Sequence, residues 1–238
     1  MNDAQLRHDL PGGAHVLFTT RAEGNMSSVR GAGAAQGHLA RERLRRRVAV
    51  DGLARGRQVH GATVARVLDE QGLSASASPQ VLQGDEGARP LGEADGQATP
   101  LRRLGLMVLT ADCLPVAVAA PGAVAVLHAG WRGLAAGIVE QGVSALRDLS
   151  GEEDLQAVIG PGAGPCCYRV GEDVHVALGG EARSGPIDLA GIAERRLRAA
   201  GVAQVRSLDV CTICDGRFFS HRREGERAGR QAGVAWLS

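Results

Sequence analysis

Two apolar runs between residues 105 and 133 constrain the fold more than any other feature of the sequence. The first, at 106–110, leads into Cys113, and the second, at 124–127, leads into His128. Short continuous apolar runs bounded by turn residues are typical of buried strands. The pattern therefore predicts two buried strands whose ends bring a thiol and an imidazole to one place. Other segments of the chain can contribute further ligands or substrate-binding residues to this pair.

Strand and helix patterns alternate along the rest of the chain. Strands are expected at 15–21, 62–68, 155–159, 202–210 and 229–237, and helices at 38–50, 134–149, 172–178 and 188–200. Small and polar residues predict loops at 22–37 and 69–93, and the arginines between 41 and 47 are expected on a solvated helix face. We predict a single-domain α/β/α sandwich with a mixed sheet over residues 16–237, after a loose lead-in segment at 1–15.

Composition excludes several classes of function. A net charge of +1 and 3% aromatic residues give no indication of a nucleic-acid partner. The sequence has neither an apolar run of about 18 residues nor a signal-peptide pattern, so we expect no membrane association and a cytoplasmic location. All 27 basic residues are arginines, which excludes Schiff-base chemistry and a lysine-containing phosphate loop.

The first candidate site combines His60, Cys113 and His128, each beside a turn that borders an apolar segment. Two imidazoles and a thiolate form a suitable ligand set for zinc or copper, with a position open for substrate. A rival interpretation makes Cys113 a nucleophile and His128 its base, oriented by Asp112 or His60. Both interpretations use the same residues, and the sequence does not separate them.

The remaining cysteines do not match a metal-binding pattern. Cys211 and Cys214 have the spacing of a zinc ribbon, but a ribbon needs a second pair. The other pair, Cys166 and Cys167, is adjacent in sequence, which is a poor geometry for one tetrahedral ion. We therefore do not predict a second metal site.

A glycine-proline turn at 160–165 and several arginines indicate an anion site. Backbone amides in such a turn can bind an anion, and arginine makes two-pronged contacts with phosphate or carboxylate. The candidate arginines at this stage are Arg132, Arg222, Arg223 and Arg230.

Eight short motifs are distributed along the chain. They are Phe18-Thr-Thr-Arg21, Gln58-Val-His-Gly61, Asp95-Gly-x-x-Thr99, Thr110-Ala-Asp-Cys-Leu-Pro115, His128-Ala-Gly-Trp-Arg-Gly133, Gly160-Pro-Gly-Ala-Gly-Pro-Cys-Cys-Tyr168, Phe219-Ser-His-Arg-Arg223 and Gly229-Arg-Gln231. Together they resemble the laccase-domain family, whose members are labelled multicopper polyphenol oxidases or purine nucleoside phosphorylases. The resemblance covers residues 16–237. The chain departs from the family pattern in 22–47, and Cys214 and His221 are also unusual for it.

The resemblance implies a zinc-binding α/β/α fold in which His60, Cys113 and His128 hold the metal, with copper as the alternative ion. It implies phosphorolysis of adenosine, inosine and S-methyl-5'-thioadenosine, with adenosine deaminase activity beside it. Purine nucleosides and phosphate are then the expected small-molecule partners. The expected catalytic residues are Cys113, His128 and Asp112, and the expected substrate- and phosphate-binding residues are Arg132, Arg222, Arg223 and Arg21.

Two alternatives remain at this point. A Cys113–His128 cysteine hydrolase or editing amidase fits because the family fold also resembles that of a toxin deamidase with a cysteine-histidine pair. A copper-dependent polyphenol oxidase fits the older family label. A multicopper oxidase needs many histidine ligands, however, and the chain has seven histidines without a His-x-His pair.

Overall fold

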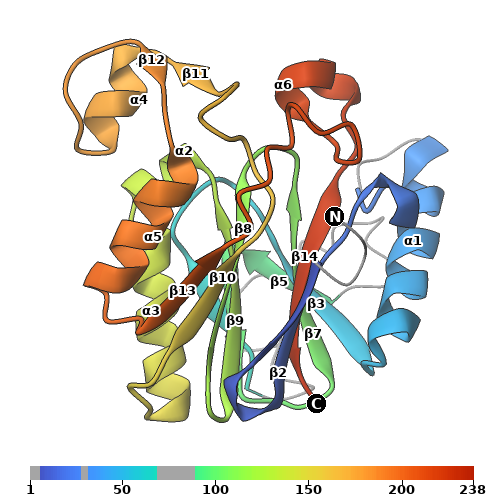
Figure 1. The fold of residues 1–238 in the computed structure, drawn as a ribbon. Coiled ribbons are helices and arrows are strands. Elements are labelled where there is room, and N and C mark those ends of the chain that lie inside the picture. The colour runs from blue at the N-terminus through green and yellow to red at the C-terminus, as the bar shows by residue number, and fades with distance from the viewer. Residues whose placement is uncertain (1–5, 28–31, 69–88) are drawn as a thin grey trace.

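The strands of this chain form two six-stranded sheets that pack face to face (Figure 1). The computed structural model describes residues 6–27, 32–68 and 89–238. The first sheet contains, in spatial order, β1 (Arg7–Leu10), β2 (Ala14–Phe18), β14 (Gln231–Leu237), β7 (Leu104–Thr110), β3 (Gly52–Arg57) and β5 (Arg89–Glu93). The second contains β13 (Gln204–Ser207), β10 (Gln156–Ile159), β8 (Leu114–Ala120), β9 (Ala123–Ala129), β6 (Gly96–Thr99) and β4 (Val64–Arg66).

Both sheets mix parallel and antiparallel pairs. In the first, β14 is antiparallel to β2 and β7, whereas β3 is parallel to β7 and β5. In the second, β8 is antiparallel to β9 and β10, whereas β13 is parallel to β10. The predicted α/β class and its mixed strand pairing are confirmed.

The stretch at 105–133 connects the two sheets. The predicted strand at 106–110 lies in β7 of the first sheet, and the predicted strand at 124–127 lies in β9 of the second. Between them the structure adds β8, which the sequence analysis did not predict as a separate strand. The three residues 111–113 form the link from β7 to β8, and Asp112 has a left-handed backbone with φ 90°.

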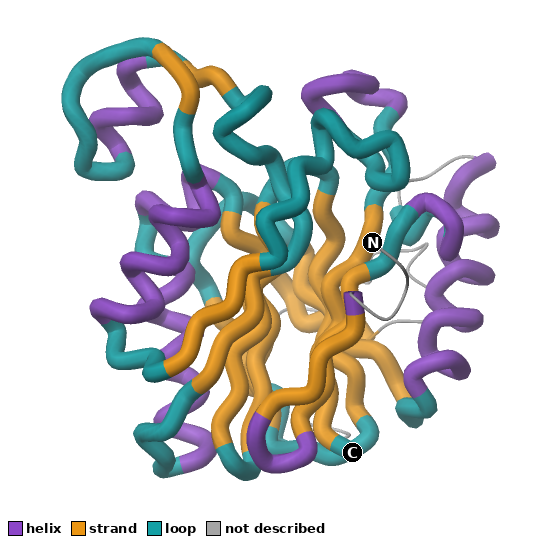
Figure 2. Tube along the Cα trace, in the orientation of Figure 1, coloured by secondary structure: helices purple, strands orange, loops and turns teal. Residues whose placement is uncertain are grey.

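Helices cover the outer faces of the sheet pair, which gives four layers. In Figures 1 and 2, α1 lies on one side of the sheets, and α3 and α5 lie on the other. Between the sheets, apolar side chains such as Phe18 and Val108 from the first pack with Ala117 and Val126 from the second. The predicted sandwich therefore has two sheets between its helical layers. Strands buried on both faces explain the continuous apolar runs in the sequence.

Three helices, α1, α3 and α5, are longer than ten residues. The other helical elements and a small third sheet are short. The helices are α1 (Ala32–Val48), α2 (Trp131–Ala135), α3 (Ile138–Ser150), α4 (Glu172–Ala177), α5 (Leu189–Ala199), α6 (His221–Glu224), and the 3₁₀ turns η2 (Pro11–Gly13), η3 (Arg21–Glu23) and η4 (Gly225–Arg227). The small sheet pairs β11 (Arg169–Val170) with β12 (Gly185–Pro186). Within the described ranges, none of the helices has the length and apolarity needed to span a bilayer.

Two predicted helices differ from the observed ones. The helix expected at 134–149 is divided, because Gly137 has φ 90° and separates α2 from α3. The helix expected at 38–50 begins at residue 32 and ends at Val48. Its arginine run is not uniformly solvated, since Arg41 is fully buried and donates to the Met26 carbonyl at 3.0 Å. The sequence pattern cannot reveal which arginine faces the sheet.

Three predicted irregular segments overlap residues outside the described ranges. Residues 1–5 of the expected lead-in, 28–31 of the first expected loop and 69–88 of the second lie outside them. The described part of the lead-in contains β1 and the start of β2, and 89–93 of the second loop forms β5.

Adding a side chain at Gly142 is expected to destabilise the protein, although alanine favours helices. A Cβ at this position in α3 would lie 2.5 Å from Cδ1 of the fully buried Leu127 in β9. Overpacking of this kind costs about 1–3 kcal/mol, which exceeds the gain in helix propensity of about 1 kcal/mol. Chemical denaturation of Gly142→Ala should show a lower free energy of unfolding; a more stable variant would contradict this packing.

Candidate metal centre and binding pocket

His60, Cys113 and His128 come together although they lie on three different segments. Cys113 ends the link between β7 and β8, His128 is in β9, and His60 follows β3. The register pairs Leu114 with Ala129, which brings Cys113 beside the end of β9. One ligand atom from each of the three residues lies within 4.8 Å of the others. We call this group the His–Cys–His cluster.

Asp95 organises the His–Cys–His cluster from a fully buried position. Its carboxylate accepts hydrogen bonds from the backbone amides of Val59 (3.0 Å), His60 (2.9 Å) and Gly61 (2.8 Å). The same carboxylate lies 2.7 Å from Nδ1 of His128. A carboxylate that accepts from Nδ1–H leaves Nε2 of the imidazole as the lone-pair donor. Asp95 therefore fixes both the His60 turn and the orientation of His128.

The charges in the cluster favour an ionised cysteine. Burial raises the pKa of the Cys113 thiol, but the charge of His128 and hydrogen bonds from His128 and His60 outweigh it and lower the pKa to about 6. Burial lowers the pKa of His128, but Cys113 and Asp95 raise it to about 9. Burial also opposes ionisation of Asp95, yet its hydrogen bonds with His128, Gly61 and Val59 lower its pKa. Cys113 is thus poised to act as a thiolate.

The cluster fits a metal ion of the zinc type by its donors and by the space around them. Two imidazoles and one thiolate are borderline-to-soft ligands, and three protein ligands leave a position open. Gly130 provides room beside them, since a Cβ there would lie 2.8 Å from the Cys113 sulfur and 3.4 Å from Cδ2 of His60. The backbone of His60 has φ 62°, an uncommon conformation that the bonds to Asp95 hold in place.

A cavity of 510 Å³ opens beside the cluster. His60, Cys113 and His128 form part of its wall, together with Asp112 and the aromatic side chains of Trp131 and Tyr168. Its other charged or ionisable lining residues are His221 and the arginines Arg55, Arg57, Arg132, Arg222 and Arg230. The cavity is therefore strongly basic, which suits an anionic ligand.

The four arginines expected to bind substrate and phosphate occupy two places. Arg132 and Arg222 line the cavity, where their guanidinium groups lie over Trp131 at 4.2 Å and Tyr168 at 5.0 Å. Arg21 and Arg223 instead form ion pairs with Glu224. Arg223 also donates to the carbonyls of Thr212 and Ile213, both at 2.8 Å. Neither Arg21 nor Arg223 is one of the described residues that line the cavity.

Asp112 connects the cluster to three other segments. One carboxylate oxygen accepts from the Thr212 hydroxyl at 2.7 Å, and the other accepts from the backbone amide of Arg222 at 2.7 Å. The carbonyl of Asp112 accepts from the amide of Ala163, also at 2.7 Å. Both carboxylate oxygens are thus engaged with the protein itself.

Sequence reasoning missed several residues of the site. Asp95 was noticed as part of a motif, but its role as the shared acceptor depends on a long-range contact. Arg55 and Arg57 were not singled out, although their spacing on β3 places both on one face just before His60. The alternation of side chains along a strand was therefore the sequence signal that could have identified Arg55 and Arg57 as residues of the site.

The sheet pair, the His–Cys–His cluster and the basic cavity define an α/β enzyme with a candidate metal centre. A family described as multi-copper polyphenol oxidoreductase laccase matches residues 16–238, and the chain belongs to this family. The predicted resemblance to laccase-domain proteins is confirmed.

Similar proteins carry names of a nucleoside enzyme. The purine nucleoside phosphorylase of Xylella fastidiosa is 40% identical over 200 residues, covering 76% of this chain and 70% of that protein. Purine nucleoside phosphorylase ORF3 of Streptomyces griseus is 33% identical over 95% of each chain. The crystal structure of YlmD from Geobacillus stearothermophilus superposes with a TM-score of 0.83 at 27% identity, covering 100% of this chain and 98% of that one.

Proposed function

We propose that this protein is a purine nucleoside phosphorylase that acts on adenosine, inosine and S-methyl-5'-thioadenosine. The observation that carries the proposal is the cavity beside the His–Cys–His cluster, which has five arginines in its wall. Such a cavity suits inorganic phosphate as co-substrate, and the names of the relatives point to the same reaction. Leu109, Trp131 and Tyr168 offer apolar surface for a purine in the same cavity.

In phosphorolysis, a phosphate oxygen bonds to the anomeric carbon of the ribose while the bond from that carbon to the purine nitrogen breaks. The base leaves with the electron pair and takes up a proton. Arg132 and Arg222 hold and orient the phosphate from the cavity wall. Asp112 acts through Arg222, because it fixes the backbone amide of that residue. This contact favours a positioning role for Asp112 over the catalytic role that we predicted.

Arg21 and Arg223 support the site from outside the cavity. Their shared partner Glu224 is in α6, the helix that also carries Arg222. We propose that Arg21 and Arg223 hold α6 in position and do not contact the substrate themselves.

We further propose that zinc is the metal and that His60, Cys113 and His128 hold it. When bound, zinc supplies a Lewis acid at this position, which is the chemistry that hydrolytic deamination of adenosine requires. Asp95 keeps the imidazole of His128 in the orientation that presents Nε2, and Gly130 keeps the space beside Cys113 free.

One observation favours a second candidate function. Cys113, His128 and Asp95 form a thiol–imidazole–carboxylate series, and the imidazole lowers the pKa of the thiol. This is the arrangement of a cysteine hydrolase, in which the thiolate attacks a carbonyl carbon. A polyphenol oxidase receives less support, because only one of the two metal-ligand groups in the described residues contains histidine.

One experiment ranks these functions. The purified protein is incubated with adenosine, with and without phosphate, and the products are separated by chromatography. We expect adenine and hypoxanthine in the presence of phosphate only, and inosine as the product in its absence. Intact adenosine in all samples of metal-loaded protein would refute the leading proposal. Amide hydrolysis that survives chelation but is lost in Cys113→Ser would support the hydrolase, and phenol oxidation that depends on copper would support the oxidase.

Replacement of Arg132 by glutamine is expected to raise the KM for phosphate by roughly tenfold, the effect of losing one charge-assisted hydrogen bond. The KM for adenosine should change less, because the base contacts other parts of the cavity. Arg103→Gln is the matched control, since Arg103 pairs with Asp51 away from the cavity. Equal phosphate KM values in the two variants would show that Arg132 does not bind phosphate. Initial-rate kinetics with varied phosphate measure the difference.

A further inference from the structure

A second group of potential metal ligands lies outside the His–Cys–His cluster. Its four sulfur atoms are all within 4.8 Å of one another. The members of this four-cysteine cluster are Cys166, Cys167, Cys211 and Cys214. Cys214 lies closest to two of them, with its sulfur 2.7 Å from that of Cys167 and 3.3 Å from that of Cys166. The sequence analysis did not predict a metal site here, and the structure brings these side chains together.

Backbone hydrogen bonds hold the two cysteine-bearing turns against each other. Gly162 forms a parallel bridge with Cys211. Its amide donates to the Val210 carbonyl at 3.1 Å, and its carbonyl accepts from the Thr212 amide at 2.9 Å. Segments that are about 50 residues apart in the sequence thereby become neighbours, and sequence spacing alone does not show this.

The adjacent cysteines can share one ion because they lie in a helix-like turn. The amides of Cys167 and Tyr168 both donate to the Gly164 carbonyl, at 3.1 and 2.9 Å. In helical geometry, successive side chains diverge by about 100°, whereas in a strand they point to opposite faces. We expected adjacent cysteines to have poor geometry for one tetrahedral ion, and the helix-like turn removes that objection.

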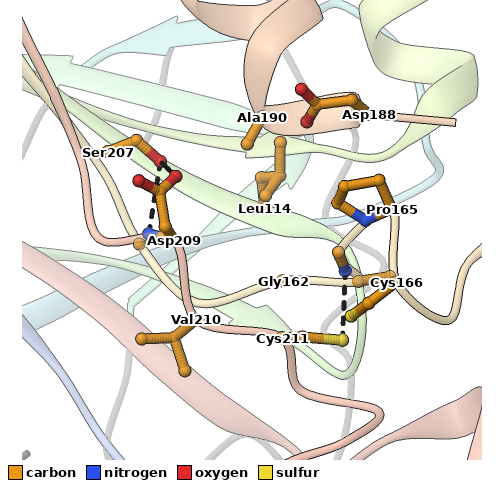
Figure 3. Close-up of a pocket in the computed structure, with 13 residues that line it drawn as sticks. Leu114, Gly162, Pro165, Cys166, Asp188, Ala190, Ser207, Asp209, Val210 and Cys211 are labelled. Atoms are coloured by element: carbon orange, nitrogen blue, oxygen red, sulfur yellow. Dashed lines mark hydrogen bonds between the residues drawn. The ribbon is translucent and has the colours of Figure 1, made fainter.

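Polar groups surround the Cys211 sulfur and the turn that carries it. The Gly164 amide donates to the Cys211 sulfur at 3.3 Å (Figure 3). The Arg223 guanidinium adds positive charge at the carbonyls of Thr212 and Ile213, between the two cysteines of this turn. Amides and cations of this kind are typical supports of metal-bound thiolates.

We propose that the four-cysteine cluster is a second metal site, which binds one zinc ion as a tetrathiolate and cross-links the two turns. Tetrahedral zinc with sulfur at about 2.3 Å requires sulfur–sulfur separations of about 3.8 Å. The separations of Cys214 from Cys166 and Cys167 are shorter than this value, and all four sulfur atoms lie within 4.8 Å of one another. Rotation of the exposed Cys166 and Cys214 side chains adjusts the closest pairs.

A disulfide explains the arrangement less well. It would use two sulfur atoms and leave two thiols beside it, whereas all four lie together here. A cavity of 320 Å³, whose wall includes Cys166 and Cys211, gives a metal ion access to the four-cysteine cluster (Figure 3).

The site has a structural consequence for the first cluster. Thr212, between two of the cysteines, donates to Asp112, the neighbour of Cys113. A metal ion that fixes the 211–214 turn therefore also fixes the support of Asp112. This inference does not depend on which reaction the enzyme catalyses.

The test uses the full chain with Cys113→Ser, so that every remaining cysteine belongs to the four-cysteine cluster. Cobalt(II) is titrated into this protein under reducing conditions, and absorbance is followed in the visible and near-ultraviolet regions. We expect one equivalent to bind, with intense d–d bands of a tetrahedral site and thiolate-to-metal charge transfer. Zinc should then displace the cobalt and abolish both signals.

A second variant identifies the ligands. Adding Cys214→Ser should weaken cobalt binding by more than about tenfold and reduce the charge-transfer intensity. Adding His221→Ala instead is the matched control, because His221 lies in the other cavity and outside this cluster, and it should leave the titration unchanged. Absence of a tetrahedral cobalt spectrum in the reduced protein overturns the proposal, as does an unchanged titration after Cys214→Ser. Since Cys113 is absent throughout, failure of the first metal site cannot produce either result.

Discussion

Asp95→Ala is expected to abolish metal binding at the His–Cys–His cluster and to reduce nucleoside turnover by at least about 100-fold. The substitution removes the acceptor for the amides of Val59, His60 and Gly61 and the partner of His128. Loss of the carboxylate behind one ligating histidine typically costs 10–100-fold in metal affinity or activity. Here the same carboxylate also fixes the turn that carries His60, so the effect should lie at or beyond the upper end of that range.

A buried polar residue in β6, the strand that directly follows Asp95, provides the control. Thr99, like Asp95, is fully buried, and its hydroxyl donates to the Val67 carbonyl and accepts from the Leu101 amide. Thr99→Val should lower stability while it leaves metal binding intact. Metal content and the adenosine assay are measured for both variants after their folding is verified by circular dichroism. A folded Asp95→Ala protein with full metal content would show that Asp95 is not the organiser of the cluster.

Gly130→Ala is expected to have the second-largest effect on the cluster. The backbone of Gly130 has φ −78°, which any residue adopts, so strain in the main chain is not the reason. The new Cβ would lie 2.8 Å from the Cys113 sulfur, and either this sulfur or the backbone after β9 must move. Since metal ligands tolerate displacements of only a few tenths of an ångström, we expect at least about tenfold weaker metal binding at this cluster.

Gly216→Ala is the matched control for this substitution. Gly216 has no heavy atom within 4 Å of an added Cβ, so the same chemical change should have little effect. Isothermal titration of metal-free protein with zinc, in a Cys214→Ser background that removes the four-cysteine site, measures the affinity. Identical zinc affinities for the two alanine variants would mean that Gly130 does not define the space beside Cys113.

The sequence allowed the strands around Cys113 and His128 to be predicted because their apolar runs are continuous. It also allowed His60 to be grouped with them, although only through the turns that each residue borders and the family resemblance. The number of sheets was not predictable in the same way. An apolar run shows that a strand is buried on both faces, but it does not show whether a helix or a second sheet covers each face.

Long-range contacts account for most of what the sequence did not show. The four-cysteine cluster depends on the bridge between Gly162 and Cys211, and the burial of Arg41 depends on how α1 faces the first sheet. The arginines illustrate the same limit. Arg132 and Arg223 both belong to motifs that carry the family resemblance, yet Arg132 lines the cavity and Arg223 donates to backbone carbonyls. Residue type indicates which contacts an arginine can make, and only the fold determines which it does make.

The link at 111–113 has a mechanical consequence. It joins the two sheets, and at its end the thiol of Cys113 lies beside His128 of the second sheet and near His60, which follows β3 of the first sheet. The spacing between the sheets is therefore also part of the geometry of the His–Cys–His cluster. Side chains in the middle of the inter-sheet core, such as Val108 and Ala117, lie outside the cluster, yet their volumes help to set the distance between His60 and the other two ligands. Packing between the sheets thus contributes to the arrangement of the candidate metal centre.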